Sequence, residues 1–382
     1  MSKDQRRQFS LVAGEASGDL LAGLMLDGLK ARWPTMQAAG IGGPQMLSRG
    51  FQSWWPQEKL AVRGYIEVLR HYPEIAGIRR QLKARLLRER PDIFIGVDAP
   101  DFNLDLEAGL RAQGVKTVHF VCPSIWAWRP ERIEKLRAAA DRVLCIFPFE
   151  PALLAEKGVA GSYVGHPLAQ VIPMQPDRAA ARAALGLPAD AQVVALLPGS
   201  RQSELRYIAT RFLEAAALMR REDPGIRFVL PTLPALRAQA QQMLQDTGMT
   251  QQVMLLDGQS HAVLAACDAT LIASGTATLE AALFKRPMVI AYNMNSLTWR
   301  LMIRKQLQPW IGLPNILCRD FVVPELIQHE ATPQALAQAT LAWLRSPDKV
   351  QVLQQRFTAL HAELLRDTPT LCADAIEQVL EG

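Results

Sequence analysis

Short apolar runs alternate with helical, amphipathic stretches along most of the chain. A helical pattern over residues 20–32, for example, follows the first apolar run after a turn that contains glycine and serine. Short β-rich runs separated by helices predict parallel strands joined by crossover helices, which is an α/β fold class. The runs that we predict as strands cover residues 9–13, 91–97, 116–121, 142–146, 192–197, 227–230, 253–256, 269–273 and 288–291.

The alternation is interrupted once, by a turn-rich stretch with several prolines between residues 165 and 187. We therefore expect two α/β domains of similar size, over 1–168 and 169–350, joined by a linker near 168–185. The remainder, 351–382, has a helical pattern, and Ser346–Pro347 is the expected break before it.

Composition removes several classes of protein. Apolar residues make up 49% of the 382 residues and charged residues 21%, which suits packed cores and not a disordered chain. No run approaches the ~18 uncharged apolar residues of a membrane span, and we expect no secretory signal, because Glu15 interrupts the first apolar run. Five scattered cysteines without a C-x-x-C pair predict a reduced, cytoplasmic chain without structural zinc.

The net charge of +5 is concentrated in one segment. Residues 60–90 hold eight basic and three acidic side chains, a surplus equal to that of the whole chain. Such a segment suits a phosphorylated substrate or an anionic membrane surface. Nucleic acid is a poorer match, because the basic residues do not belong to a recognisable nucleic-acid module.

Ligands of open parallel sheets bind beyond the carboxyl ends of the strands, so the residues after each run are the candidates for a site. Residues 14–19 (GEASGD) could receive a phosphate or sugar hydroxyls at a helix start, or form a plain turn in which Ser17 or Asp19 caps the helix. Asp98 is placed as a general base or as a helix cap, and Asp101 is the better cap.

The second half carries two turns suited to a nucleotide. Pro198, Gly199 and Ser200 would expose backbone N–H groups beside Arg201, which fits a pyrophosphate. Gly275 and Thr276 would open a helix that favours phosphate, with Glu280 one turn deeper to accept ribose hydroxyls. The alternative is an ordinary capped helix with a surface glutamate. A dinucleotide fingerprint, a P-loop, a metal-ligand cluster and a nucleophile elbow are all missing from the sequence.

Six motifs in this order and spacing resemble the lipid-A-disaccharide synthases, a family of inverting glycosyltransferases of Gram-negative lipopolysaccharide biosynthesis. The resemblance extends from about Leu11 to Leu380. The motifs are AGEASGD (13–19), GVDAPDFN (96–103), PSIWAWR (123–129), LLPGSR (196–201), ASGTATLE (273–280) and LPN (313–315).

The resemblance implies the GT-B architecture: two Rossmann-like domains facing a cleft, with a C-terminal helix crossing back to the first domain. It implies transfer of 2,3-diacylglucosamine from UDP to 2,3-diacylglucosamine 1-phosphate, giving a β(1→6)-linked disaccharide 1-phosphate and UDP. It implies no metal and no cofactor. A peripheral position on the inner face of the inner membrane and a homodimer with exchanged C-terminal segments are also expected.

Residue roles follow from the same match. Asp98 corresponds to the candidate base, with Glu15 and Asp19 as further catalytic candidates and Ser17 and Gly18 in an acceptor loop. The residues matching the UDP-side motifs are Gly199, Ser200, Arg201, Ser274, Gly275, Thr276, Glu280 and Asn315.

Membrane contact is expected in the basic segment, where Pro73 and Gly77 should interrupt any single long helix. Its apolar side chains would lie on anionic lipid, or alternatively face the domain core. The expected contact residues are Ile66, Val68, Leu69, Tyr72 and Ile75.

Two other functions fit parts of the pattern. A UDP-sugar epimerase of the same architecture would share the nucleotide half but would not need two acyl-chain sites. A lipid-binding or scaffold protein would explain the basic apolar segment but not the turns at Arg201 and Glu280.

Overall fold

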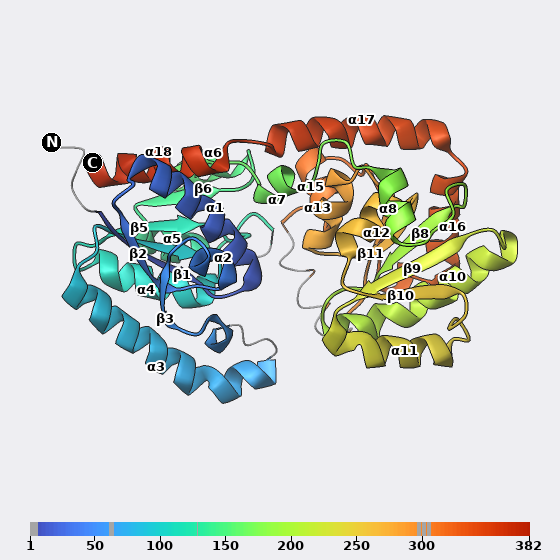
Figure 1. The fold of residues 1–382 in the computed structure, drawn as a ribbon, viewed down its shortest axis with the longest axis horizontal. Coiled ribbons are helices and arrows are strands. Elements are labelled where there is room, and N and C mark those ends of the chain that lie inside the picture. Colours follow the sequence, from blue (N-terminus) through green and yellow to red (C-terminus); the bar gives the residue numbers. More distant parts are fainter. Residues whose placement is uncertain (1–6, 61–64, 128, 296–298, 300–302, 304–306) are drawn as a thin grey trace. The chain divides into compact units, whose positions relative to one another are not determined.

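The computed structural model describes residues 7–60, 65–127, 129–295, 299, 303 and 307–382, with the backbone only for 65–72. The described chain divides into two compact units. The first contains residues up to Pro167 together with Leu364–Gly382, and the second contains Leu168–Glu363. Each unit is built on its own parallel sheet, as the alternating pattern predicts (Figure 1).

The first unit holds a sheet in the order β3-β2-β1-β4-β5-β6-β7, and its strand pairs are parallel. The order reverses between β1 and β4, which makes this point the topological switch of the sheet. The strands are β1 (Gln8–Ala13), β2 (Gln37–Ile41), β3 (Gln52–Trp55), β4 (Ile93–Val97), β5 (Lys116–Phe120), β6 (Arg142–Cys145) and β7 (Gly161–Tyr163).

Helices cover both faces of the first sheet. One face packs against α3 and α4, whose Ile78, Leu82 and Leu106 join Phe94 in a buried cluster. On the other face α1 lies beside α18, and at Gly28 the backbone of Pro369 approaches so closely that a Cβ would lie 1.9 Å from its carbonyl oxygen. The helices are α1 (Ala16–Arg32), α2 (Pro44–Leu47), η1 (Gln57–Lys59), α3 (Tyr65–Glu89), α4 (Pro100–Arg111), α5 (Arg132–Ala139), α6 (Glu150–Ala155) and α18 (Thr368–Glu381).

The second unit repeats the arrangement with the strand order β10-β9-β8-β11-β12-β13, again with parallel pairs. Its switch point lies between β8 and β11. The strands are β8 (Val193–Leu197), β9 (Arg227–Thr232), β10 (Val253–Asp257), β11 (Ala269–Ala273), β12 (Met288–Tyr292) and β13 (Glu325–Ile327).

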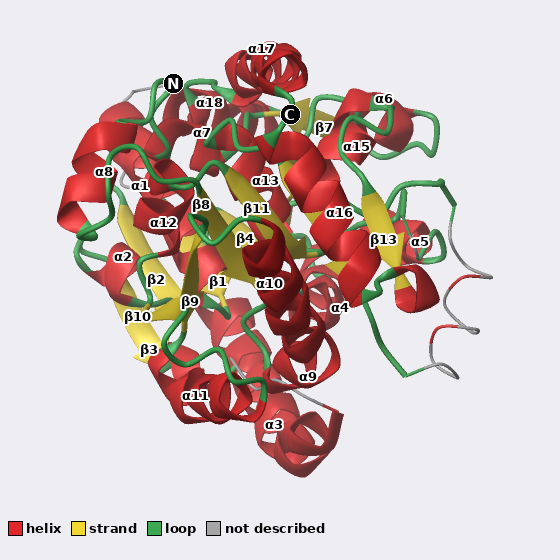
Figure 2. Cartoon of the chain, turned by 90° about the vertical axis from the view of Figure 1, so that its right-hand side faces the viewer, coloured by secondary structure: helices red, strands yellow, loops and turns green. Residues whose placement is uncertain are grey.

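Helices α10, α11 and α16 cover one face of the second sheet (Figure 2) and share a buried hydrophobic cluster with its strands. Helices α8, α12 and α13 contact the sheet or one another on the opposite side. The helices are α7 (Pro167–Val171), α8 (Arg178–Ala184), α9 (Gln202–Glu204), η2 (Leu205–Ala209, a π-helix), α10 (Thr210–Glu222), η3 (Pro234–Leu236), α11 (Arg237–Asp246), α12 (Ser260–Ala266), α13 (Thr276–Leu283), α15 (Leu313–Cys318), η4 (Gln328–Glu330), α16 (Pro333–Leu344) and α17 (Pro347–Leu364).

The structure refines three expectations about organisation. The tail is divided between the units: α17 belongs to the second until Glu363, and α18 returns to the first. The break at Ser346–Pro347 is confirmed, since α16 ends at Leu344 and α17 begins at Pro347. The stretch 168–185 is not a bare linker, because α8 is anchored by buried Arg182, which donates to Ala266 O and pairs with Asp268.

The expected interruption of the basic segment is wrong. Helix α3 runs unbroken from Tyr65 to Glu89 and contains Pro73 (Figure 1). A proline removes one backbone hydrogen bond, and the packing of Ile78, Leu82 and Leu86 on the core holds the second half of the helix in place.

Candidate functional site

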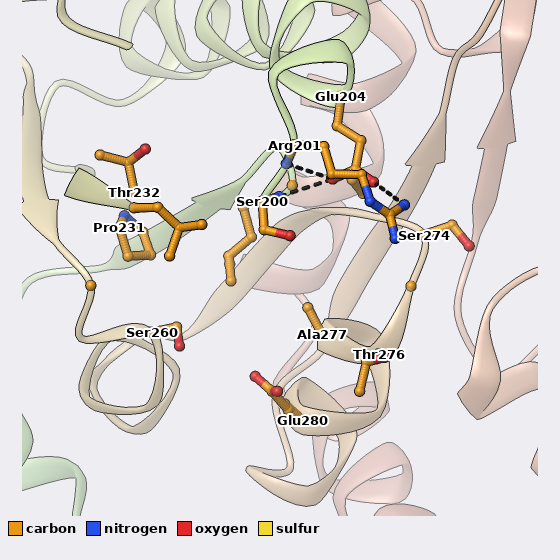
Figure 3. A pocket seen from close by; sticks show the side chains of 16 residues that line it. Ser200, Arg201, Glu204, Pro231, Thr232, Ser260, Ser274, Thr276, Ala277 and Glu280 are labelled. Atoms are coloured by element: carbon orange, nitrogen blue, oxygen red, sulfur yellow. Dashed lines mark hydrogen bonds and ion pairs between the residues drawn. The ribbon is translucent and has the colours of Figure 1, made fainter. Parts of the chain in front are cut away.

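A pocket of about 380 Å³ lies at the switch point of the second sheet. It opens beyond the carboxyl ends of four neighbouring strands, and the two predicted turns form part of its wall (Figure 3). Its volume is within the range of small-molecule sites. The lining residues are Leu197, Gly199, Ser200, Arg201, Glu204, Pro231, Thr232, Leu233, Gly258, Ser260, Ala273, Ser274, Gly275, Thr276, Ala277 and Glu280.

The turn after β8 has the backbone that its sequence demands. Gly199 adopts φ +113°, a conformation that side chains disfavour, and a Cβ there would lie 2.2 Å from the Glu204 carboxylate. That carboxylate accepts the backbone N–H groups of Ser200 (2.9 Å) and Arg201 (3.2 Å) and pairs with the Arg201 guanidinium at 3.0 Å. The groups expected to receive a pyrophosphate therefore hold a protein carboxylate in this structure.

The turn after β11 places the start of α13 against the pocket. Gly275 has φ +152°, and a Cβ there would meet no atom within 4 Å, so backbone conformation and not space explains the glycine. Ser274, Gly275 and Thr276 line the wall together. The positive end of the α13 dipole favours an anion at this place.

Glu280 lies one turn further along α13 and faces the same pocket, as the spacing from Thr276 predicts (Figure 3). Its side chain is largely buried, and its carboxylate lies 3.6 Å from His261 Nε2. The ring of His261 in turn packs edge-on against Phe284. Glu280 therefore has a defined orientation as a hydrogen-bond acceptor within the pocket.

Asn315 occupies a different place from the other UDP-side residues. Its side chain is fully buried in α15, where Nδ2 donates to Val323 O (2.9 Å) and Glu325 Oε1 (2.8 Å), and Oδ1 accepts from Val323 N. Glu325 also accepts the N–H groups of Ile311 and Gly312, so the set ties the residues before α15 and the loop after it to β13. Asn315 is not part of the pocket wall, and its contact with UDP stays a prediction.

Sequence reasoning missed the part of the wall that follows β9 and β10. Pro231, Thr232 and Leu233 come from the end of β9, and Gly258 and Ser260 follow β10. The signal was present, because both strands were predicted and their carboxyl ends point to the same edge of the sheet. Glu204 was missed because its role depends on how α9 folds back onto the preceding turn.

In the first unit, the predicted loops follow β1 and β4, the two strands that flank its switch point. Ser17 is exposed, and Gly18 is buried where a Cβ would lie 3.4 Å from Val97 O, close to β4. Neither Ser17 nor Asp19 caps α1, because the helix begins after Glu15 without a side-chain cap. The alternative interpretation of a capped turn is therefore wrong, because residues 16–19 already belong to the helix.

Asp19 is instead tied to a neighbouring segment. Its buried carboxylate accepts the N–H groups of Gly43 (2.9 Å), Gln45 (2.8 Å) and Met46 (3.1 Å), which satisfies the start of α2. A carboxylate engaged by three donors suits an anchoring role better than proton transfer. Among the catalytic candidates, this arrangement favours Asp98 and Glu15 over Asp19.

Asp98 directly follows β4 and has a strained backbone conformation. It has φ +52°, and Ala99 after it has φ +42°, so two consecutive non-glycine residues adopt the left-handed region. Neither Asp98 nor Asp101 is the cap of α4, since Ala99 occupies that position and Asp101 pairs with Arg132 at 2.6 Å. The cap expectation is therefore wrong for both, because the chain enters α4 one residue after Asp98.

Burial raises the pKa of Asp98, and the negative charge of Glu15 acts in the same direction. The backbone N–H of Ala99 and the charge of His119 oppose the rise. Asp98 is half-buried, so its carboxyl group is accessible to a ligand. Its raised pKa also makes it a weaker acid than an exposed aspartate. These are the properties of a general base held at the end of a strand.

Only one of the five expected membrane-contact residues has a described side chain. The side chains of Ile66, Val68, Leu69 and Tyr72 lie outside the described residues. Ile75 is half-buried and packs against the core cluster of the first unit. From Ile75 onward, the apolar side of α3 therefore faces the core, as the alternative interpretation expects.

Two features are missing from the described part of the chain. Within it, no group of three or more His, Cys, Asp or Glu side chains could hold a metal ion. Nor does any described helix combine the length and hydropathy needed to cross a membrane.

Comparison with known proteins connects the site to a family. The family model described as lipid-A-disaccharide synthetase matches residues 9–376. The lipid-A-disaccharide synthase of Albidiferax ferrireducens is 67% identical over 99% of this chain and 98% of its own length. That of Verminephrobacter eiseniae is 62% identical over 98% of this chain and 97% of its own.

Solved structures share the fold at low identity. A glycosyltransferase from Rickettsia africae superposes with a TM-score of 0.59 at 10% identity, covering 99% of this chain and 98% of that one. The UDP-GlcNAc 2-epimerase of Neisseria meningitidis bound to UDP-GlcNAc gives 0.63 at 11% identity, covering 99% and 100%. These likenesses agree with the two Rossmann-like domains of the GT-B fold class and establish the fold alone.

Proposed function

Because the chain belongs to the lipid-A-disaccharide synthase family of glycosyltransferases, we propose that it joins UDP-2,3-diacylglucosamine to 2,3-diacylglucosamine 1-phosphate. The product is the β(1→6) disaccharide 1-phosphate, and UDP leaves with inversion at the donor's anomeric carbon. One observation carries the nucleotide part: Arg201, the start of α13 and Glu280 line a single pocket at a switch point.

UDP binds in the second unit under this proposal. The guanidinium of Arg201 and the start of α13 stabilise the diphosphate, and Glu280 accepts the ribose hydroxyls. The uracil ring contacts the part of the pocket wall at the carboxyl ends of β9 and β10, which consists of Pro231, Leu233 and Gly258. The UDP-sugar bound by the Neisseria epimerase of similar fold supports a nucleotide-sugar ligand.

The first unit holds the acceptor and supplies the base. Asp98 takes the proton of the acceptor's 6-hydroxyl as that oxygen bonds to the anomeric carbon. The bond to UDP breaks with its electron pair, and Arg201 and the α13 start stabilise the leaving diphosphate. The strained backbone at Asp98 and its raised pKa support this role. Glu15 is the next candidate.

Membrane attachment belongs to the same proposal, since both substrates carry acyl chains. The N-terminal half of α3, with Val68, Leu69 and Tyr72 beside basic residues, contacts anionic lipid on the inner face of the inner membrane. The protein also forms a homodimer that exchanges C-terminal segments. The packing of α18 on α1 is the contact that such an exchange would reproduce between chains.

The test is turnover with synthetic UDP-2,3-diacylglucosamine and 2,3-diacylglucosamine 1-phosphate, with the product identified by mass. We expect UDP release only when both lipid sugars are present. An epimerase would convert or release the nucleotide sugar without the second lipid sugar. A lipid-binding scaffold would show no turnover and no UDP binding by calorimetry, and either result would reject the proposal.

A further inference from the structure

A buried pair of ionisable residues lies in the first unit, and neither the motifs nor the proposed reaction uses it. Glu107 on α4 and His119 on β5 are both fully buried. The Glu107 carboxylate accepts from His119 Nδ1, with Oε1 at 2.9 Å and Oε2 at 3.1 Å. Burying an ionisable pair costs solvation free energy unless its hydrogen-bond geometry is good. We therefore looked for a function of this pair.

The chain makes room for this pair at Gly96. A Cβ on Gly96 would lie 2.0 Å from Glu107 Oε1, so any side chain there would displace the carboxylate. Gly96 lies directly opposite His119 in the parallel register of β4 and β5. The glycine of the strand that leads to Asp98 is therefore explained by the carboxylate that crosses over it to reach the histidine.

The same strands bring the pair to Asp98. Asp98 follows Gly96 by two residues, and its N–H donates to Phe120 O, the residue after His119, at 2.8 Å. A charged His119 ring favours ionised Asp98, whereas burial and the charge of Glu15 oppose it. His119 Nε2 is buried and has no hydrogen-bond partner among the described residues, so the ring keeps one unsatisfied polar atom.

We propose that Glu107 and His119 are positioning residues for Asp98: Glu107 holds the His119 ring, and the ring favours the ionised Asp98 carboxylate. The inference rests on the proposed role of Asp98 as the base. The charged groups acting on Asp98 are then His119 from β5 and Glu15 from the loop after β1, with Glu107 behind His119. During transfer, the hydroxyl proton moves to Asp98 and afterwards to solvent, and the dyad itself gains and loses no atoms.

The unsatisfied Nε2 argues against a role limited to packing. A hydrophobic pair of the same size would fill the space without leaving a polar atom unpaired, and such replacements are often neutral or stabilising. Burial raises the pKa of Glu107, and the interaction with His119 opposes this rise. A role limited to packing would not require this balance.

The pH profile of kcat/KM separates positioning from packing. His119→Asn keeps an N–H donor toward Glu107 but removes the positive charge, and Glu107→Gln removes the charge that supports it. In both variants we expect the acid limb to move up by about one pH unit, with a roughly tenfold loss below the limb that recovers at higher pH. The double variant should show the same shift as each single one. His166→Asn, at another buried histidine of this unit, should leave the limb in place.

An unchanged acid limb in folded His119→Asn and Glu107→Gln protein would overturn the proposal. Should both variants fail to fold, ¹⁵N NMR of the histidine rings in Asp98→Asn supplies the answer. We expect the His119 ring resonances to shift while those of His361, in the other unit, do not. Unshifted His119 resonances would overturn the coupling. Retained turnover in Asp98→Asn would instead reject Asp98 as the base, so the two failures are distinguishable.

Discussion

Glu204 holds the backbone N–H of Ser200 at 2.9 Å, in the turn where a diphosphate is proposed to bind. The carboxylate also engages Arg201, so it occupies both the neutral and the charged donors of this turn (Figure 3). A bound diphosphate and Glu204 compete for the same groups. Glu204 must therefore give up these contacts, or share them, when UDP binds.

The first prediction concerns this competition. Glu204→Ala should bind UDP more tightly, by roughly fivefold, because a competing hydrogen bond is worth about 1 kcal/mol net. Isothermal titration calorimetry measures the change, and Glu214→Ala, at an exposed glutamate of α10, is the matched control. Weaker binding in Glu204→Ala would mean that the carboxylate organises the turn instead of competing for it.

Arg201 and Glu280 carry the second prediction. Each alanine variant should lose a charge-assisted contact of about 1.5–3 kcal/mol, which is roughly 10- to 150-fold in UDP affinity. Arg221→Ala, at an exposed arginine outside the pocket, should bind UDP as the wild type does. Unchanged affinity in both pocket variants would remove UDP from this site.

The third prediction concerns the pH dependence of the activity that Asp98 is proposed to support. The base acts in its ionised form, and burial raises its pKa. As pH falls, kcat/KM should decline at a pH above the range of an exposed aspartate. Asp98→Asn should lower turnover by about 10²- to 10⁴-fold while leaving UDP affinity unchanged. Near-full turnover in this variant would direct the search to Glu15.

The fourth prediction tests the anchoring role of Asp19. Asp19→Ala leaves three N–H groups at the start of α2 without their acceptor and should lower the free energy of unfolding by about 2 kcal/mol. Asp27→Ala removes only a surface ion pair with Arg49 and should cost less than about 1 kcal/mol. Urea denaturation of both variants makes the comparison; equal midpoints would mean that the α2 contacts contribute little.

The fifth prediction concerns the membrane. Replacing Val68, Leu69 and Tyr72 together with serine should preserve the fold but reduce binding to vesicles that contain anionic lipid. Added salt should weaken wild-type binding, since each basic residue near such a surface contributes about 1 kcal/mol. Val352→Ser, at an exposed apolar residue of α17, is the control. An unfolded triple variant would assign these residues to the core.

The sequence alone was enough to predict the central strands, because strands that are buried on both faces appear as continuous apolar runs. In β4 and β8, five consecutive residues are buried. A short apolar run of this length is typical of a strand that is covered on both faces, so the predicted strands agree with the observed ones. The strands that the pattern missed are β2, β3, β7 and β13, of which three lie at sheet edges. Strands near an edge bury less side-chain surface, and a segment such as Gly161–Tyr163 carries no distinctive apolar run.

The sequence also determined the chemistry of the turns. Glycine at 199 and 275 is demanded by a local backbone angle, and the spacing of Thr276 and Glu280 is a property of one helix. Because a local conformation and the rule for strand ends require no knowledge of distant segments, the pocket could be located before any fold was known.

Tertiary structure alone decided the polar partnerships. Asp19 meets Gly43, Glu107 meets His119 and Asn315 meets Glu325 through contacts between different elements, and none of these pairs has a signature in the spacing of residues. A carboxylate in a sequence is equally suited to an exposed base and to a buried anchor. Which of the two it becomes depends on the donors that packing brings within about 3 Å, because a buried polar group must find a partner or lose its hydration without compensation.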